Sequence, residues 1–455
     1  MIDPTDKLAE KMRGILRVPS AARARPPVLL WCAVISILLA PSCQSTKKTS
    51  SLEKAPTMYT NVVAPEEPST QGNFTQSVIP TRPTPTAQPV VATSSPNTVA
   101  EQNVAMARST LAKSGALECA RRFHRAQEPV EIRVVAPSTH GLLTIQVLDT
   151  NGKSLGDLGV TPGIVDLRPL VPNIENLSKA AWVQLCEDGT PIGAPIVLEP
   201  LRSPPSVRTM RAQRKGTNDE YTRIVGWGDR LLNPDDQEVV AASAQWIASE
   251  PIVLSGFRTE LDVDAIVQTD AGPIRIAFAP DAAPATVRNF VTLADQGFYN
   301  NTIFHRIVPM NREGQPFVIQ GGDPTGTGDG GPGWNLALEP SDLQHDIGVV
   351  GMARGDDPHS AGSQFYISLS REGTARLDGQ YCTFAYVVSG RDALNKITQA
   401  NIADAATGRP SDAPKIQEVI IVAAPPRVLG ENRRNQRIRS DTLKVIDTTT
   451  SPQSP

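Results

Sequence analysis

The stretch that decides the fold runs from Thr302 to Asp323 and reads TIFHRIVPMNREGQPFVIQGGD. Its two halves, 302–308 and 316–323, are rich in β-branched and aromatic residues and are bounded by Pro and Gly, as is typical of short strands. Further segments of this kind flank it: 264–278, with a turn at Asp270–Pro273, and 348–354, 362–368 and 383–388. Many short strands with few helices indicate a closed β-barrel.

One amphipathic helix is predicted within this region. Pro284 suits the first turn of a helix, and Gly297 suits the position just after its end. Apolar residues recur between them at helical spacing, namely Val287, Phe290, Val291, Leu293 and Ala294. We expect this face of the helix to pack against the strands.

Six motifs follow one another in this region: Phe304-His-Arg306, Phe317-Val-Ile-Gln-Gly-Gly-Asp323, Met352-Ala353, Gly362-Ser-Gln-Phe-Tyr366, Leu377-Asp-Gly379 and Phe384. In this order they resemble the motifs of the cyclophilins. The resemblance covers about residues 263–422. It implies an eight-stranded antiparallel β-barrel with a helix over each open end, and hence a mainly β chain. It also implies the activity of that family, which interconverts the cis and trans forms of X-Pro peptide bonds.

This chemistry requires no nucleophile. Amide resonance sets a barrier of about 18–20 kcal/mol to rotation about the C–N bond. A catalyst must bind the twisted amide, whose prolyl nitrogen carries a free lone pair, better than either planar isomer. Arg306 stands at the family's catalytic arginine position, and its permanently charged guanidinium is a suitable donor to that lone pair.

The resemblance also assigns roles around Arg306. Phe317 and Gln320 complete the catalytic set, with Gln320 orienting the arginine and contacting the substrate backbone. The backbone at Ala353 and Arg354 would hold the residue before proline. The socket for the proline ring and its border comprise Phe317, Val318, Gln364, Tyr366, Leu377 and Tyr381. Any of these aromatic residues alone would be more typical of a core, but their order beside Arg306 favours a site.

The region departs from the family pattern at four places. An insertion, Met310–Pro316, precedes Phe317. Arg354 replaces an asparagine, Arg376 a tryptophan important for cyclosporin, and Tyr381 a pocket histidine. We therefore expect cyclosporin to inhibit this protein weakly, and a nanomolar inhibition constant on the purified protein would contradict that expectation. The same differences leave the substrate preference open.

Neither a cofactor nor a metal site is predicted. The run Gly326–Gly331 fits G-x-G-x-x-G, but Pro332-Gly333 follows it instead of a helix, which favours a surface loop over a dinucleotide site. The 5 histidines lack the spacing of metal ligands. We expect His305 to pack or hydrogen-bond beside Arg306.

Composition favours a peptide partner over a nucleic acid. With 44 Lys and Arg against 47 Asp and Glu, the net charge is -3, which offers no electrostatic case for nucleic acid. The resemblance implies proline-containing polypeptides as partners. Two alternatives are a non-catalytic module that holds such peptides and an envelope scaffold built on the preceding β-rich domain. Arg306 favours catalysis, because proline binding alone would not need it. The sequence indicates no oligomeric state.

Residues 1–43 predict export to the cell envelope. Arg23 and Arg25 precede the apolar run 28–40, which is short for a membrane span and suits a signal segment. Cys43 follows in a stretch that resembles the bacterial lipobox. Lipidation of Cys43 would anchor the chain to a membrane, facing the periplasm or the exterior, while ordinary cleavage and an uncleaved anchor stay open.

The rest of the chain divides by composition. The predicted segments are a disordered Ser/Thr/Pro-rich linker at 44–99, a small β-rich, sandwich-like domain of unknown role at 100–205, a connector at 206–259, the isomerase-like domain at 260–425 and a disordered polar tail at 426–455. Within the β-rich domain we expect a helix at 100–120 and strands at 130–135, 142–148, 181–185 and 196–198. Cys119 and Cys186 could form a bridge or remain inert buried thiols.

Overall fold

The computed structural model describes residues 116–439, except 138–139, 172–173, 215, 217, 229 and 234–255. The export segment with Cys43, the linker 44–99 and residues 440–455 lie outside the described residues. All the described residues belong to one compact unit, Val90–Pro455. No helix among them is long and apolar enough to cross a membrane.

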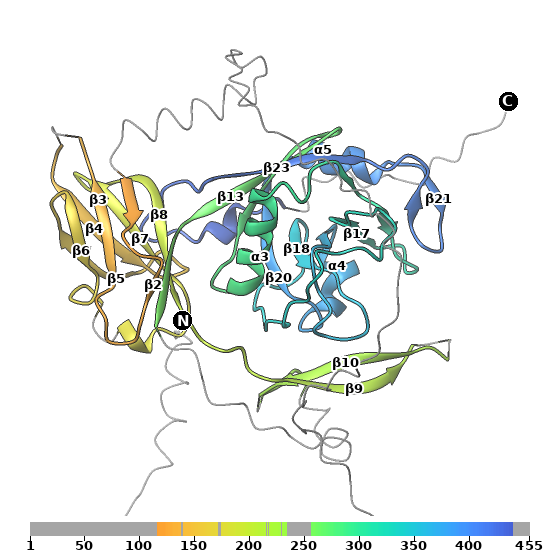
Figure 1. The fold of residues 1–455 in the computed structure, drawn as a ribbon. Coiled ribbons are helices and arrows are strands. Elements are labelled where there is room, and N and C mark those ends of the chain that lie inside the picture. Colours follow the sequence, from red (N-terminus) through yellow and green to blue (C-terminus); the bar gives the residue numbers. More distant parts are fainter. Residues whose placement is uncertain are drawn as a thin grey trace, which may run out of the picture. The chain divides into compact units, whose positions relative to one another are not determined.

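The first part is the predicted β-rich domain, which consists of two antiparallel sheets (Figure 1). The smaller sheet has the order β1 (Ala116–Cys119), β3 (Glu131–Val135) and β6 (Gly163–Asp166). The larger has the order β2 (Phe123–His124), β12 (Phe257–Leu261), β8 (Thr190–Pro200), β7 (Ala181–Glu187), β4 (Leu143–Leu148) and β5 (Ser154–Gly159). Apolar side chains from both sheets, among them Ile132 and Ile145, form a single core.

This domain contains three strands, β2, β5 and β6, that the sequence did not predict, and it differs from the prediction at its start and end as well. Residues 116–119 form strand β1, so the helix expected at 100–120 is wrong there, and the rest of that segment lies outside the described residues. Strand β12 comes from the end of the predicted connector, yet it pairs with β8 over its whole length. Such a pairing joins residues far apart in the chain, so a local pattern does not reveal it.

Three described cysteines, Cys119, Cys186 and Cys382, are free thiols. Of the two possibilities left open for Cys119 and Cys186, the structure therefore has the unpaired thiols. Burial raises the pKa of both. Because the thiolate is the reactive form, these positions are poorly suited to nucleophilic chemistry.

Residues 263–423 form the predicted barrel. Nine antiparallel strands follow one another in the order β15 (Thr302–Ile303), β23 (Lys415–Ala423), β13 (Val263–Thr269), β14 (Gly272–Phe278), β20 (Thr383–Ser389), β18 (Val349–Met352), β19 (Phe365–Ser368), β17 (Pro316–Gly321) and β16 (Arg306–Met310). The first and last, β15 and β16, are parts of one strand interrupted at Phe304 and His305, which reconciles the count with the predicted eight. A bridge between Ile303 and Asp323 closes the ring. Strands β21 (Ile402–Asp404) and β22 (Arg409–Pro410) form a separate pair.

Two helices cover the barrel, α3 (Pro284–Asp295) and α5 (Arg391–Thr398) (Figure 1). Helix α3 begins at Pro284 and buries Val287, Phe290, Leu293 and Ala294 of its predicted apolar face, while Val291 is partly buried against the same core. The Phe290 ring lies 4.8–5.7 Å, between centroids, from four other aromatic rings: Phe278, Tyr299, Phe365 and Phe384. The short segments α4 (Arg371–Thr374) and η4 (Ala375–Leu377) lead to the predicted socket.

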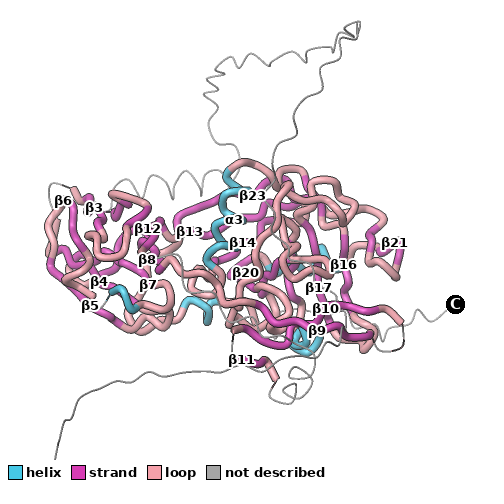
Figure 2. Tube along the Cα trace, turned by 60° about the horizontal axis from the view of Figure 1, so that its bottom comes forward, coloured by secondary structure: helices cyan, strands magenta, loops and turns pink. Residues whose placement is uncertain are grey.

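The connector forms a β-hairpin that packs on the barrel. Strands β9 (Val207–Gln213) and β10 (Glu220–Trp227) pair with each other, and β11 (Arg230–Leu231) pairs with β10 (Figure 2). Ile224 and Trp227 of β10 are buried in the barrel core. Residues 234–255 of the predicted connector lie outside the described residues.

The predicted disordered tail is wrong for residues 426–439, which we call the C-terminal strap. It includes the short helix η5 (Arg433–Gln436), and Arg427 and Arg433 are 6% and 4% exposed. Arg427 donates to Asp262 at 3.0 Å, and its guanidinium stacks 3.9 Å from the ring of Trp182 in the β-rich domain. A run of basic residues is typical of solvated chain. The carboxylates that pair with the arginines of the strap lie far away in sequence, so the local pattern did not indicate burial.

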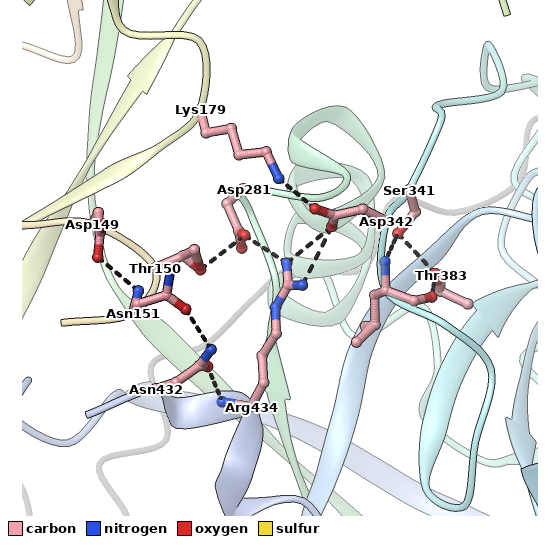
Figure 3. A network of polar contacts seen from close by, with 11 residues as sticks. Asp149, Thr150, Asn151, Lys179, Asp281, Ser341, Asp342, Thr383, Asn432 and Arg434 are labelled. Atoms are coloured by element: carbon pink, nitrogen blue, oxygen red, sulfur yellow. Dashed lines mark hydrogen bonds and ion pairs between the residues drawn. The ribbon is translucent and has the colours of Figure 1, made fainter. Parts of the chain in front are cut away.

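The strap also joins the two domains through a polar network (Figure 3). Arg434 contacts Asp281 at 2.5 Å and Asp342 at 3.2 Å, both in the barrel region. Asn432 donates to Asn151 of the β-rich domain at 2.9 Å. Lys179 of that domain pairs with Asp342 directly. Residues of the strap, the β-rich domain and the barrel therefore share one network of hydrogen bonds and ion pairs.

A buried ion pair in the β-rich domain makes its stability depend on pH. Glu199 pairs with Arg258, and both side chains are at most 10% exposed. Burial raises the pKa of Glu199 from 4.5 to about 7, against the attraction of Arg258. The folded chain therefore holds this proton more tightly than the unfolded chain, so the free energy of unfolding should fall as pH rises from about 4.5 to about 7. Urea unfolding of wild type and Glu199→Gln at several pH values in this range would measure this fall. If the free energy of unfolding depended on pH equally in both proteins, Glu199 would not be its source.

Candidate active site

Three of the predicted site residues lie side by side on neighbouring strands. Arg306 on β16 is opposite Gln320 on β17, which is opposite Tyr366 on β19. Directly opposite residues on adjacent strands share a face of the sheet, so the three side chains form a row. Ile307 and Ile319, one position along, belong to the barrel core. The row therefore lies on the outer face of the barrel wall.

A glycine completes this row on the fourth strand. Gly351 on β18 is opposite Tyr366, and a Cβ placed on Gly351 would lie 2.5 Å from the Tyr366 hydroxyl oxygen. Any larger residue would thus displace the tyrosine. The missing side chain creates the space in which the Tyr366 ring lies.

A chain of hydrogen bonds fixes Arg306. Its Nη1 donates to Gln320 Oε1 at 3.2 Å, and Gln320 Nε2 donates to Gln364 Oε1 at 3.0 Å. Gln364 Nε2 in turn donates to the carbonyl oxygens of Gly328 and Gly330 in the glycine-rich loop, each at 2.8 Å. The orientation of the guanidinium is thereby set by two amide side chains and a loop backbone.

The electrostatics of Arg306 suit a fixed donor. Burial lowers the pKa of Arg306, but an arginine remains charged at neutral pH because its ordinary pKa is so high. In a partly dehydrated site its hydrogen bonds are stronger than in water. His305 beside it is 7% exposed and packs against Gly328, and burial lowers its pKa.

Tyr366 is held in place by residues that the sequence analysis did not assign to the site. Its hydroxyl lies 2.6 Å from His345 Nε2, and His345 Nδ1 lies 2.9 Å from Asp378 Oδ1. Burial raises the pKa of Tyr366, so the hydroxyl keeps its proton. Arg371 also contacts Asp378, at 2.6 Å. No local pattern pointed to His345, because its partners come from other segments.

Two arginines line the rim of the predicted socket. The Arg376 guanidinium lies 4.9 Å from the centroid of the Phe317 ring, and that of Arg354 lies 4.8 Å from the Tyr381 ring. The Tyr381 ring meets Tyr366 edge-on at 5.9 Å. Cation–π contacts of this kind hold the rings at a defined angle.

The inserted loop contacts the rim. Asn311 accepts from the amides of Glu313 and Gln315 and so folds the loop between β16 and β17 into a turn. Glu313 then lies 3.7 Å from Arg376, with both side chains more than half exposed. The insertion therefore changes the socket border without entering the row of Arg306.

The remaining predicted residues lie around the same row. The backbone amide of Ala353 donates to the Gln364 carbonyl at 2.9 Å. Val318 and Tyr366 are buried, while most of the others are partly exposed: Arg306, Phe317, Gln320, Ala353, Arg354, Gln364, Leu377 and Tyr381. Their roles toward a substrate stay a prediction. The geometry defines a class of protein: a closed β-barrel with a fixed arginine on its outer wall beside an aromatic socket.

Comparison with known proteins identifies the family. Residues 265–421 match the family model described as "Cyclophilin type peptidyl-prolyl cis-trans isomerase/CLD". The chain is 37% identical over 166 residues to a peptidyl-prolyl cis-trans isomerase-like 1 of Aspergillus fumigatus, a match covering 35% of this chain and 95% of that protein. The chain therefore belongs to the cyclophilin-type peptidyl-prolyl cis-trans isomerase family.

Other relatives share only this region. A peptidyl-prolyl cis-trans isomerase-like 2 of Cryptococcus neoformans is 37% identical over 164 residues, which cover 34% of this chain and 26% of that protein. The chain thus spans about a quarter of that relative's length. A crystal structure of a Cryptosporidium parvum cyclophilin, in the presence of the dipeptide Ala-Pro, has a TM-score of 0.32 and 30% identity, covering 35% of this chain and 99% of that one.

Proposed function

We propose that this protein accelerates cis/trans rotation of X-Pro bonds in polypeptides. One observation carries the proposal: Arg306 is fixed by Gln320 in the same row as the Tyr366 side chain. This arrangement supplies a rigid cationic donor and an apolar surface next to each other. Membership of the isomerase family supports the same conclusion.

The chemistry follows from the barrier to rotation. In the planar amide the prolyl nitrogen shares its lone pair with the carbonyl, whereas in the twisted amide the lone pair is localised. Arg306 would donate to that lone pair, and Gln320 would hold the guanidinium in position. A donor that is already oriented stabilises the twisted state without reorganisation at the moment of reaction. Socket residues such as Phe317 and Leu377 would hold the proline ring while the acyl group rotates.

A non-catalytic proline-binding module is the alternative, and NMR exchange spectroscopy separates the two. An Ala-Pro-containing peptide in large excess over the full chain gives separate cis and trans signals, because uncatalysed exchange takes tens of seconds or longer. A catalyst produces exchange cross-peaks between them at sub-stoichiometric protein. A binding module shifts the signals without cross-peaks, and that result would refute the proposal.

We further propose that the protein acts in the cell envelope, on exported or folding proteins, through an N-terminal membrane tether. The apolar run 28–40 and Cys43 support this proposal. Mass spectrometry of the mature N-terminus tests it. A lipidated Cys43 at the N-terminus is the expected result, whereas an intact, unmodified Met1 in a protein recovered without membranes would overturn it.

A further inference from the structure

The β9–β10 hairpin is bonded to one loop of the socket rim through a single glutamine. Gln380 Oε1 accepts from the Ile224 amide at 2.8 Å, and Gln380 Nε2 donates to the Ile224 carbonyl at 2.8 Å. The side-chain amide thus binds both polar groups of one strand residue, as a neighbouring strand would. Ile224 itself is fully buried in the barrel core. Gln380 immediately precedes Tyr381 of the rim.

The hairpin also holds the second rim loop, which carries Arg354. Asp356 Oδ1 accepts from the Thr222 amide at 2.6 Å, and Asp356 Oδ2 accepts from Arg211 Nη1 at 2.6 Å. The hydrogen bond from Thr222, together with Arg211, holds the pKa of Asp356 below its ordinary value. This loop is therefore bonded to both strands of the hairpin.

Between these two anchors the rim residues bond to each other. Arg354 Nε donates to the Gln380 carbonyl at 3.0 Å, and Arg354 Nη1 donates to the Gly355 carbonyl at 2.8 Å. The same guanidinium lies over the Tyr381 ring, which meets Tyr366 in the socket. Hairpin, Gln380, Arg354, Tyr381 and socket thus form one continuous set of contacts.

We infer that the β9–β10 hairpin is a positioning element of the isomerase site, and that Gln380 is the residue through which it acts. It fixes Arg354 and Tyr381 and so determines the preference for residues next to the proline. The hairpin lies outside residues 265–421, the part shared with the family model. Its hydrogen bonds described above reach the loops of Arg354 and Gln380, so it is expected to affect substrate selection more than the rotation step. The inference rests on the proposed function.

Replacing Gln380 with alanine in the full chain tests the inference. We measure kcat and KM on peptides that differ only in the residue before proline, with acidic, basic, aromatic and alanine members. Loss of the two hydrogen bonds should raise KM for the preferred peptides by about fivefold and narrow the spread of kcat/KM across the series by a similar factor, with kcat little changed. A purely structural role would lower thermal stability without changing this spread.

Two further variants control the experiment. Gln213→Ala makes the same substitution on the hairpin, but Gln213 contacts Asn218 rather than the rim, so the peptide series should match wild type. Gln380→Glu keeps an acceptor for the Ile224 amide and loses the donor to its carbonyl. Its KM values and its spread of kcat/KM should therefore lie between those of wild type and Gln380→Ala. Hydrogen exchange of the Ile224 amide reports directly whether the hairpin has been released.

Hydrogen exchange at Ile224 and the kcat/KM values of the peptide series together decide the inference. Faster exchange at Ile224 with a narrowed peptide series supports the inference. Faster exchange with an unchanged series overturns it, and so does unchanged exchange at Ile224, because Gln380 would then not hold the hairpin. If wild type shows no isomerisation, the proposed function fails instead. The affinities of the same peptides, measured by NMR titration, then test the role of the hairpin independently.

Discussion

Arg306→Ala is expected to lower kcat/KM for X-Pro isomerisation by about 10²- to 10³-fold, as does removal of other preorganised donors to a transition state. Alanine removes the only charged group that the structure places in the row with Gln320 and Tyr366, among the described residues. The socket that holds the proline ring remains. KM should therefore change less than kcat, because the lost interaction is made mainly in the twisted state.

A graded series tests the reason for this loss. Arg306→Lys keeps the charge but lacks the planar fork that bonds Gln320, so its rate should lie between those of wild type and Arg306→Ala. Arg312→Ala, on the exposed inserted loop, serves as the matched control and should be as active as wild type. Rates come from a protease-coupled or NMR exchange assay, and circular dichroism confirms folding. Equal rates for wild type and Arg306→Ala would exclude catalysis by this arginine.

Arg433→Met is expected to reduce the free energy of unfolding by about 3–5 kcal/mol, the usual effect of removing one partner of a buried ion pair. Arg433 Nη2 donates to both carboxylate oxygens of Asp264, at 2.9 and 2.8 Å. Asp264 is fully buried, and Asp262 beside it is 3% exposed. Burial already raises the pKa of Asp262, so losing a nearby cation makes its ionised form still more costly.

A second arginine of the C-terminal strap provides the control for this measurement. Arg437 pairs with Asp346 at 2.5 Å, but both side chains are more than a quarter exposed. The same change, Arg437→Met, should cost less than about 1 kcal/mol, because solvent screens such pairs. Urea unfolding of the three proteins gives the comparison. If Arg433→Met does not fold, Arg433→Lys supplies a milder change. Similar urea midpoints for the Arg433 and Arg437 variants would contradict the burial of the Arg433–Asp264 pair.

The sequence alone predicted the barrel, and its resemblance to the cyclophilins named the candidate residues around Arg306. Helix α3 begins at Pro284 and buries the apolar positions that its periodicity selects, since an amphipathic pattern states which face is inside. The segments around Arg306, Gln320 and Tyr366 are rich in β-branched and aromatic residues, as strands are. Their adjacency in a row was implied only by the family resemblance, because the register of the strands is a tertiary property.

Only the tertiary structure decided which polar residues are buried and paired. Arg433 in the sequence belongs to a basic run typical of solvated chain, yet its partner Asp264 lies at the start of the barrel. Gln380 and His345 likewise acquire their roles from Ile224 and Tyr366. The physical reason is the same in each case. A polar side chain is stable inside a protein only with its partner present, and the partner comes from a distant segment that local periodicity does not report.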